Sequence, residues 1–223
     1  MVEWRRWLRA LAGGKRTVRQ TRRCCLEVLE DRLAPAAWVP QVSGTTQSPF
    51  GVSGSGPNDI FAVGFGGTIL HSSNDGSSWQ AQNSGTTQDF ERVWTGGHGD
   101  VFAVGGNNTI RHSADDGTSW KAQASGTWQY LYGVWGSGPN DVFAVGGGGA
   151  IQHSADAGVS WQTQHSGSAW FLQCVWGSGP GDIFAVGVDG TILHSADDGT
   201  SWQAQASGTT QTLSIAVTSG PMI

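Results

Sequence analysis

Charged residues are scarce in this sequence of 223 residues, at 13%, and basic residues are largely confined to its first 37 positions. Residues 1–37 contain nine of the twelve lysines and arginines and four of the seventeen acidic residues, which gives a net charge of +5. Residues 38–223 contain the other three basic and thirteen acidic residues, a net charge of −10. Because binding to a phosphate backbone requires clustered Lys and Arg, we expect no nucleic-acid partner.

Cysteine is also rare, with three residues in the chain. Cys24 and Cys25 are adjacent near the N-terminus, and Cys174 lies far from both. No spacing fits a zinc site, and an odd number of cysteines gives no disulfide framework. We therefore interpret Cys174 as a small core residue.

Long apolar runs are absent, so the sequence offers neither a signal-peptide core nor a membrane span. Residues 1–37 are interpreted as a basic leader that is either a flexible tail or a helix. The helical alternative rests on apolar residues at helical spacing with arginines between them, namely Trp4, Trp7, Leu8 and Leu11. Such a helix could contact an anionic membrane surface.

A short segment of the leader gives a hint of location. Residues 26–36, LEVLEDRLAPA, follow an arginine-rich stretch. They resemble the L-E-x-L-E-x-R-x-x-P segment near the start of many bacterial secreted and surface proteins. The resemblance implies an extracellular or cell-surface location.

Glycine and tryptophan are abundant instead, with 35 and 12 residues. Short apolar segments punctuated by glycine predict an all-β fold. From Trp38 onward the sequence repeats every 41 residues. The motif FAVG begins at Phe61, Phe102, Phe143 and Phe184. Each repeat divides into four strand-like pieces, which are 132–137, 141–147, 150–154 and 160–164 in the third repeat. Four strands in about 40 residues are typical of one blade of a β-propeller.

The predicted propeller covers residues 38–223, and its repeats are incomplete at both ends. The four full repeats cover about 50–82, 91–123, 132–164 and 173–205, and we expect partial end strands at 38–43 and 211–217. Three arrangements remain open. The ring could close with four blades, or the two end strands could pair as a thin fifth blade. Alternatively, exposed edges could be completed by another copy in a homo-oligomer.

Each repeat contains one nonapeptide of the type HSADDGTSW, at 71–79, 112–120, 153–161 and 194–202. The fixed Gly suits a turn position with positive φ, and an Asp or Asn side chain can accept hydrogen bonds from nearby backbone N–H groups. We expect the Trp to bury its ring beneath the turn. Asn replaces Asp in the first repeat, and an amide can accept these hydrogen bonds but cannot act as a general base. We therefore predict a structural role for the nonapeptide.

The nonapeptide resembles the Asp-box, S-x-D-x-G-x-[ST]-W, which is also called the BNR repeat, of sialidase-like propellers. The matching residues are Ser72, Asn74, Gly76 and Trp79; Ser113, Asp115, Gly117 and Trp120; Ser154, Asp156, Gly158 and Trp161; and Ser195, Asp197, Gly199 and Trp202. The longer pattern also resembles bacterial surface propellers and, more distantly, the propellers of photosystem II assembly factors. The resemblance implies the fold rather than a ligand.

The residues that a sialidase requires are missing. That family uses three arginines to bind the substrate carboxylate, together with a Tyr/Glu nucleophile pair and an acidic Asp. Residues 38–223 contain only Arg92 and Arg111, a single glutamate at Glu91, and Tyr130 and Tyr132 in one repeat. We therefore predict that the protein is not an enzyme, with glycosidase activity as the weakest alternative.

Histidines recur at equivalent positions of the repeats, at His71, His112, His153 and His194. Successive blades would spread them around the ring, whereas zinc requires ligand atoms about 2 Å from one ion. We expect each to be a structural residue beside its nonapeptide, and we expect no metal or other cofactor.

The repeats differ most just after each SGT or SGS, in 46–53, 87–94, 128–135 and 169–176. These links should share a face with the loops at 65–67, 106–108, 147–149 and 188–190. We expect Leu131, Leu172 and Phe90 to pack between blades. The candidate ligand-binding residues on that face are Trp128, Tyr130, Tyr132, Trp170 and Phe171.

Two functions are consistent with these patterns. The first is a non-catalytic binding or scaffold propeller that recognises a carbohydrate or a protein through the aromatic residues. The second is a purely structural repeat protein that assembles with itself.

Overall fold

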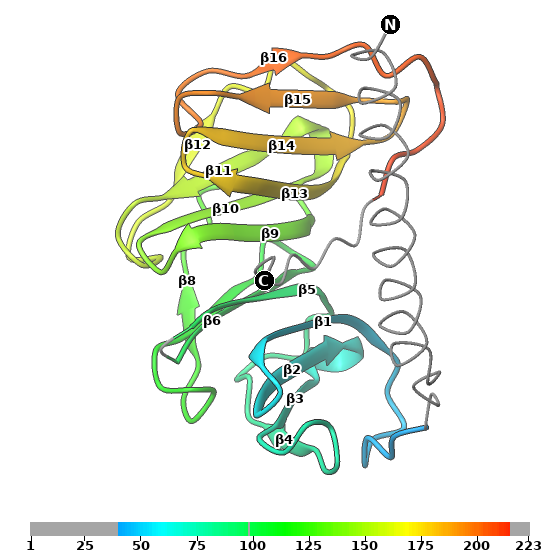
Figure 1. The fold of residues 1–223 in the computed structure, drawn as a ribbon, viewed down its shortest axis with the longest axis vertical. Coiled ribbons are helices and arrows are strands. Elements are labelled where there is room, and N and C mark those ends of the chain that lie inside the picture. Colours follow the sequence, from blue (N-terminus) through cyan, green and yellow to red (C-terminus); the bar gives the residue numbers. More distant parts are fainter. Residues whose placement is uncertain (1–39, 98, 215–223) are drawn as a thin grey trace, which may run out of the picture. The chain divides into compact units, whose positions relative to one another are not determined.

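The computed structural model describes residues 40–97 and 99–214. Their regular structure consists of sixteen strands and two short 3₁₀ turns, η1 (Phe65–Gly67) and η2 (Gly147–Gly149). The strands form four antiparallel sheets of four strands each (Figure 1). The predicted all-β class with four-stranded blades is confirmed. Among these residues, no helix has the length and apolar character needed to span a bilayer.

Each sheet is one blade, and its strands follow one another in chain order from the inner to the outer edge. The strands of blades 1 to 4 are, in order, β1 (Pro49–Gly56), β2 (Asp59–Gly64), β3 (Ile69–Ser72), β4 (Gln80–Gln82); β5 (Phe90–Gly97), β6 (Asp100–Gly105), β7 (Ile110–Ser113), β8 (Lys121–Gln123); β9 (Leu131–Gly138), β10 (Asp141–Gly146), β11 (Ile151–Ser154), β12 (Gln162–Gln164); and β13 (Leu172–Gly179), β14 (Asp182–Gly187), β15 (Ile192–Ser195), β16 (Gln203–Ala204).

The second strands of the two central blades are the most deeply buried of the second strands. In β6 and β10, every residue after the first Asp is buried. Both faces of these strands are therefore covered, which explains why the sequence there is a continuous apolar run rather than an alternating one. The outer strands β4, β8 and β12 are exposed and rich in glutamine, as expected for a solvent-facing edge.

The hydrophobic core lies between blades rather than within them. One buried cluster combines Phe61 and Val63 of blade 1 with Phe90 and Val93 of blade 2, and two equivalent clusters join blades 2 and 3 and blades 3 and 4. A single blade cannot bury its apolar faces alone, so stability depends on the stacking of neighbours.

Residues in the links between blades contribute to these clusters. Leu131, Leu172 and Phe90 are each completely buried, as predicted. Cys174, on β13, is only partly buried, so its interpretation as a core residue is wrong. Its strand, β13, has a neighbouring blade on only one side among the described residues.

The inner strands contact one another in chain order, β1 with β5, β5 with β9, and β9 with β13. Strands β1 and β13 share no contact of comparable extent. The four described blades therefore do not close a four-bladed ring.

The described parts of the predicted end strands, residues 40–43 and 211–214, form no strand. The second segment instead bonds to blade 4: Leu213 N–H donates to the O of Gly187, the last residue of β14, at 2.8 Å, and Gly190 N–H in the following loop donates to Gln211 O at 2.9 Å. Just before it, Gln211 N–H donates to Thr209 Oγ1 at 3.1 Å, as Gln129 N–H donates to Thr127 Oγ1 in an earlier link. The leader at 1–37, and residues 38–39 and 215–217 of the predicted end strands, lie outside the described residues.

Candidate functional site

The nonapeptide turns connect the third strand of each blade to the fourth and are closed by their own side chains. In blade 3, Asp156 Oδ1 accepts the backbone N–H of Ser160 at 2.8 Å, and Oδ2 accepts its hydroxyl at 2.6 Å. The buried Ser154 hydroxyl accepts the N–H of Gly158 at 2.8 Å. Asn74 in blade 1 accepts the N–H of Ser78 at 2.9 Å in the same way. Both carboxylate oxygens of Asp156 are thus occupied within the turn.

We expect Asp156→Ala to lower the melting temperature at neutral pH and Asp156→Asn to lower it less, since an amide oxygen still accepts the Ser160 N–H as Asn74 does in blade 1. The hydroxyl and N–H of Ser160 hold the pKa of Asp156 below 3.8. A lowered pKa gives a contribution to stability that is present above pH 3.8 and is lost as the pH falls through the folded-state pKa. The difference in melting temperature between wild type and Asp156→Ala should therefore be smaller in acid than at neutral pH. Circular dichroism melts at the two pH values measure it. Equal melting temperatures at neutral pH would contradict a stabilising role of the turn.

The nonapeptide tryptophans of blades 2 to 4 pack against the preceding blade, a contact that the sequence did not predict. Trp161 meets Phe102 edge-on, with ring centroids 6.2 Å apart and planes at 78°. A Cβ on Gly158 would lie 2.8 Å from Phe102 Cε1, so only glycine leaves room for that ring. We call this contact the blade joint: the Phe of one blade packs against the Gly and Trp of the nonapeptide in the following blade. Three such joints occur among the described residues, at Phe61, Phe102 and Phe143.

The recurring histidines stack on the phenylalanine of each joint. His153 stacks on Phe143 with centroids 4.1 Å apart, and its Nε2 lies 2.7 Å from Asp141 Oδ1. The same Phe–His stack and His–Asp pair occur in all four blades. The four histidines thus make equivalent contacts in separate blades, as expected from their spacing in the sequence.

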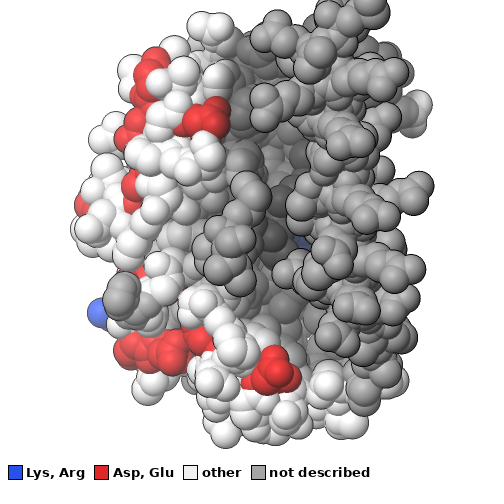
Figure 2. All heavy atoms as spheres, in the orientation of Figure 1, with Lys and Arg blue, Asp and Glu red and all other residues white. Residues whose placement is uncertain are grey.

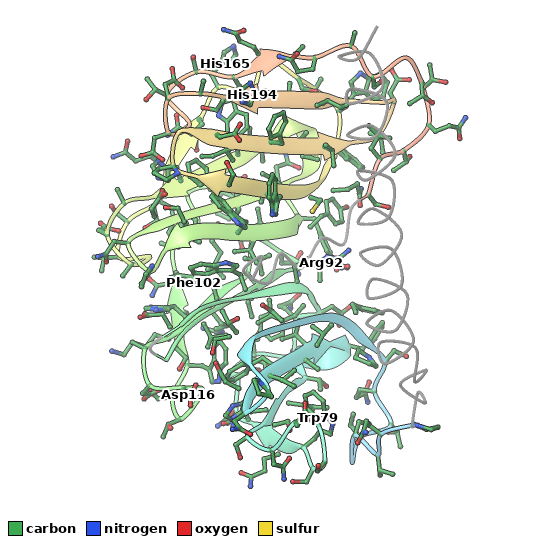
Figure 3. The ribbon with its side chains drawn as sticks, in the orientation of Figure 1. Trp79, Arg92, Phe102, Asp116, His165 and His194 are labelled. Atoms are coloured by element: carbon green, nitrogen blue, oxygen red, sulfur yellow. The ribbon has the colours of Figure 1, made fainter. Side chains whose placement is uncertain are left out.

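Two joints also bring together groups that could hold a metal ion. Asp116, in the nonapeptide of blade 2, joins Asp59 and His71 of blade 1, with candidate ligand atoms all within 4.8 Å of one another. Asp198 of blade 4 joins Asp141 and His153 of blade 3 in the same way. The histidine spacing alone did not predict these groups, because each one takes its second aspartate from the following blade. Asp116, labelled in Figure 3, comes from another repeat than its partners.

Each group places two carboxyl groups close together, which favours the protonated form of one of them. Burial raises the pKa of Asp116, and the negative charge of Asp59 and a hydrogen bond to it raise it further. Burial and the charge of Asp141 likewise raise the pKa of Asp198. The joint between blades 2 and 3 has Ala157 at the position that Asp116 and Asp198 occupy in the other two joints. The joint therefore forms without the additional carboxylate.

The links between blades and the loops between second and third strands lie on one face, as predicted, and we call it the link face. Gly66 N–H donates to Asp89 Oδ1 at 2.8 Å, and Gly147 N–H donates to Tyr130 O at 2.9 Å. The nonapeptides lie at the opposite ends of the third strands. Figure 2 shows most of its visible acidic side chains on the side where strand β15 ends in Figure 1.

Three of the five candidate aromatic residues form a row on the link face. Tyr130 stacks on Tyr132 with centroids 5.0 Å apart, and Tyr132 contacts Phe171 of the next link at 6.2 Å. The Tyr130 hydroxyl donates to Glu91 Oε1 at 3.2 Å. Burial, followed by the charge of Glu91, raises the pKa of Tyr130 to about 12, so the hydroxyl is neutral at physiological pH.

The other two candidates make no ring contact with this row among the described residues. Trp128 is 93% exposed, and Trp170 is 54% exposed. Trp170 lines a separate open groove of about 620 Å³ together with Asp189 and Trp202 of blade 4. The link face therefore presents one ordered aromatic row and two exposed indoles rather than a single cluster of five.

Comparison with known proteins identifies the fold but no family. No protein-family model matches the sequence, and no curated protein matches it. The structure is similar to that of YCF48 from Cyanidioschyzon merolae, with a TM-score of 0.61, 20% identity, and coverage of 77% of this chain and 60% of that chain. A structure of YCF48 bound to D1 peptide gives a TM-score of 0.60, 19% identity and the same coverage.

An ancestral GH74 enzyme is similar at a TM-score of 0.60 and 20% identity, over 78% of this chain and 26% of that chain. The chain therefore spans less than two thirds of each of these proteins. The similarities confirm the predicted β-propeller.

Proposed function

We propose that this protein is a non-catalytic binding propeller that holds a segment of a partner protein on its link face. The observation that carries the proposal is the aromatic row Tyr130, Tyr132 and Phe171. Phe171 is 48% exposed although it is a large apolar residue on a link between blades. Exposed apolar groups beside polar loops are typical of interaction sites.

The row is held in position by contacts beneath it. Tyr130 is fixed by its hydrogen bond to Glu91, and its ring passes over Gly106, where a Cβ would lie 3.1 Å from Tyr130 Cε2. Tyr132 is held between Tyr130 and Phe171. Such preorganised rings lose little conformational entropy when a ligand binds, which favours them as binding residues.

A peptide segment is the ligand that we favour. The similar fold of YCF48 is bound to D1 peptide in one structure, which supports peptide recognition by a propeller of this type. A carbohydrate is the second candidate, because the flat indoles of Trp128 and Trp170 are exposed at 93% and 54% and could stack on sugar rings. The nonapeptides, which we propose are Asp-boxes, serve as scaffold in either case.

The arrangement of acidic groups supports the absence of catalysis. Glycosidases use two carboxyl groups separated by about 5–9.5 Å on either side of the bond that is cleaved. The Asp59–Asp116 and Asp141–Asp198 pairs are closer, with ligand atoms within 4.8 Å, and each lies at a blade joint. On the link face, Glu91 is occupied by the Tyr130 hydroxyl.

Binding can be tested with peptide and glycan arrays probed with the full chain, followed by calorimetry with the strongest array ligand. We expect a peptide to be selected, and Tyr132→Ala and Phe171→Ala each to weaken its binding by about tenfold or more, the effect typical of a central aromatic contact. Val159→Ala is the matched control, because Val159 is 79% exposed and apolar but lies in a nonapeptide turn.

The outcomes separate the two ligand classes. Selection of a glycan whose binding depends on Trp128 or Trp170 would replace the peptide proposal by the carbohydrate one. Equal effects of Tyr132→Ala and Val159→Ala would contradict the aromatic row as the site.

We further propose that the protein acts outside the cell or at its surface. The support is the resemblance of residues 26–36 to a segment of bacterial surface proteins. Detection of the chain only in the cytoplasmic fraction would contradict this location.

A further inference from the structure

The blade joints have two different sides. The Phe side consists of Phe, His and Asp of one blade, and the nonapeptide side consists of Gly and Trp of the following blade. Three joints are complete among the described residues. Among the described residues, the four blades therefore leave one Phe side, on blade 4, and one nonapeptide side, on blade 1.

The Phe side of blade 4 is fully formed but uncovered by any described blade. Phe184 stacks on His194 at 4.3 Å, and His194 Nε2 lies 2.9 Å from Asp182 Oδ1. The other three phenylalanines are completely buried, whereas Phe184 is only partly buried. The side chains of His194 and Asp182 are 29% and 46% exposed, compared with 9% and 18% for the equivalent pair of blade 2.

The nonapeptide side of blade 1 has the conformation that the complete joints require. Asp75 and Gly76 have φ of 56° and 76°, within a few degrees of their counterparts in blade 2. A Cβ on Gly76 would meet nothing closer than Gln41 and Trp79 at 3.9 Å. At the three complete joints, a Cβ on the equivalent glycine would lie 2.5–2.8 Å from a phenylalanine. In blade 1, no described residue fills the space that a phenylalanine ring fills elsewhere.

We propose that the Phe side of blade 4 in one copy binds the nonapeptide side of blade 1 in a second copy. Two such joints would close two copies into a ring of eight blades. The second copy is the occupant that the geometry favours, because the same two surfaces already cover each other three times within the chain. Propellers close with about four to eight blades, so two copies satisfy both free sides, whereas three copies would exceed that range. Figure 3 shows Trp79 and His194 on the first and fourth blades, which provide these free sides.

Charge at the new joint would match that of the existing ones. Asp75 occupies the position of Asp116 and Asp198 in the repeat and would approach Asp182 and His194. The joint would therefore repeat the Asp–His–Asp group found between blades 1 and 2 and between blades 3 and 4. The surfaces of this joint differ from the link face, so the two copies could pair whether or not the aromatic row binds a peptide.

The mass of the full chain in solution is the first test, measured by light scattering after size exclusion. We expect twice the chain mass of 23.4 kDa. Phe184→Arg and Trp79→Glu each damage one side of both joints, so each variant alone should run as a monomer. Val159→Arg is the matched control, because it places the same charge on an exposed apolar residue away from the free sides, and it should remain a dimer.

Mixing the two variants distinguishes this joint from a face-to-face dimer. A mixed pair has one joint with both sides damaged and one joint with both sides intact. We therefore expect an equimolar mixture of Phe184→Arg and Trp79→Glu to recover dimer that neither variant forms alone. Circular dichroism melts would identify a variant that fails to fold, and Phe184→Ala would then replace Phe184→Arg.

A monomeric wild-type chain would overturn the proposal, because the free sides would then be uncovered or covered by the chain's own end segments. A dimer that both variants leave intact, or one that mixing does not restore, would place the contact on another surface. A larger ring would overturn the eight-bladed assembly.

Discussion

Replacing Phe143 by alanine is expected to lower the free energy of unfolding by about 3–5 kcal/mol, the usual cost of removing a buried aromatic ring. Phe143 is completely buried, stacks on His153 and meets Trp202 of the next blade edge-on at 6.3 Å. The substitution leaves a cavity at the joint between blades 3 and 4, where neither blade can collapse without losing its stacking partner. Urea denaturation of the full chain, followed by circular dichroism, measures the loss.

Trp128→Ala is the control for that experiment. It removes a larger ring, but one that is 93% exposed, and changes at such surface positions usually alter stability by no more than about 0.5 kcal/mol. A loss below about 1 kcal/mol for Phe143→Ala would show that the joints do not hold the blades together. A broadened transition for Phe143→Ala would show that blade 4 separates from blades 1–3 before those three blades unfold.

The second large effect is expected at the glycine of the same kind of joint. Gly158→Ala should destabilise the protein by about 2–4 kcal/mol, because a conformational cost and a steric cost add. The residue has φ of +79°, where a side chain costs about 1–2 kcal/mol. The new Cβ would also lie 2.8 Å from Phe102 Cε1, which forces the ring or the turn to move.

Gly167→Ala separates the two costs. Gly167 has φ of +68° but no heavy atom within 4 Å of the position that a Cβ would take, so this variant carries only the conformational cost. The difference between the two losses, from urea denaturation, measures the clash with Phe102. Equal losses would mean that Phe102 moves aside freely and that the joint does not require glycine.

Most of the fold followed from the spacing of a few residues. The 41-residue period, the FAVG strands and the glycine-rich turns predicted four strands per blade, and the sheets lie where these patterns placed them. Hydrogen bonds within the nonapeptide were also predictable, since Asp156 and Ser160 are only four residues apart. The prediction failed at the chain ends, where residues 40–43 and 211–214 lack a neighbouring strand with which to pair.

The candidate site was predicted less completely. Five aromatic residues were grouped from the sequence because they fall on adjacent links, but the structure joins only Tyr130, Tyr132 and Phe171 by ring contacts. Trp128 and Trp170 are exposed and make no ring contact with them among the described residues. The sequence did not predict that Glu91 fixes Tyr130, because the two residues lie 39 positions apart in different repeats.

The sequence by itself determined what depends on neighbours along the chain: the all-β class, the number of strands per repeat, the turn chemistry and the structural His of each blade. Only the tertiary structure decided what each repeat does for the next one. It showed that Trp161 covers Phe102, that Asp116 reaches Asp59, and that the surface of Phe184 is uncovered by a described blade. The physical reason is that hydrogen bonds in turns are local, whereas burial and charge in a repeat protein are settled between blades, by residues about 41 positions or more apart.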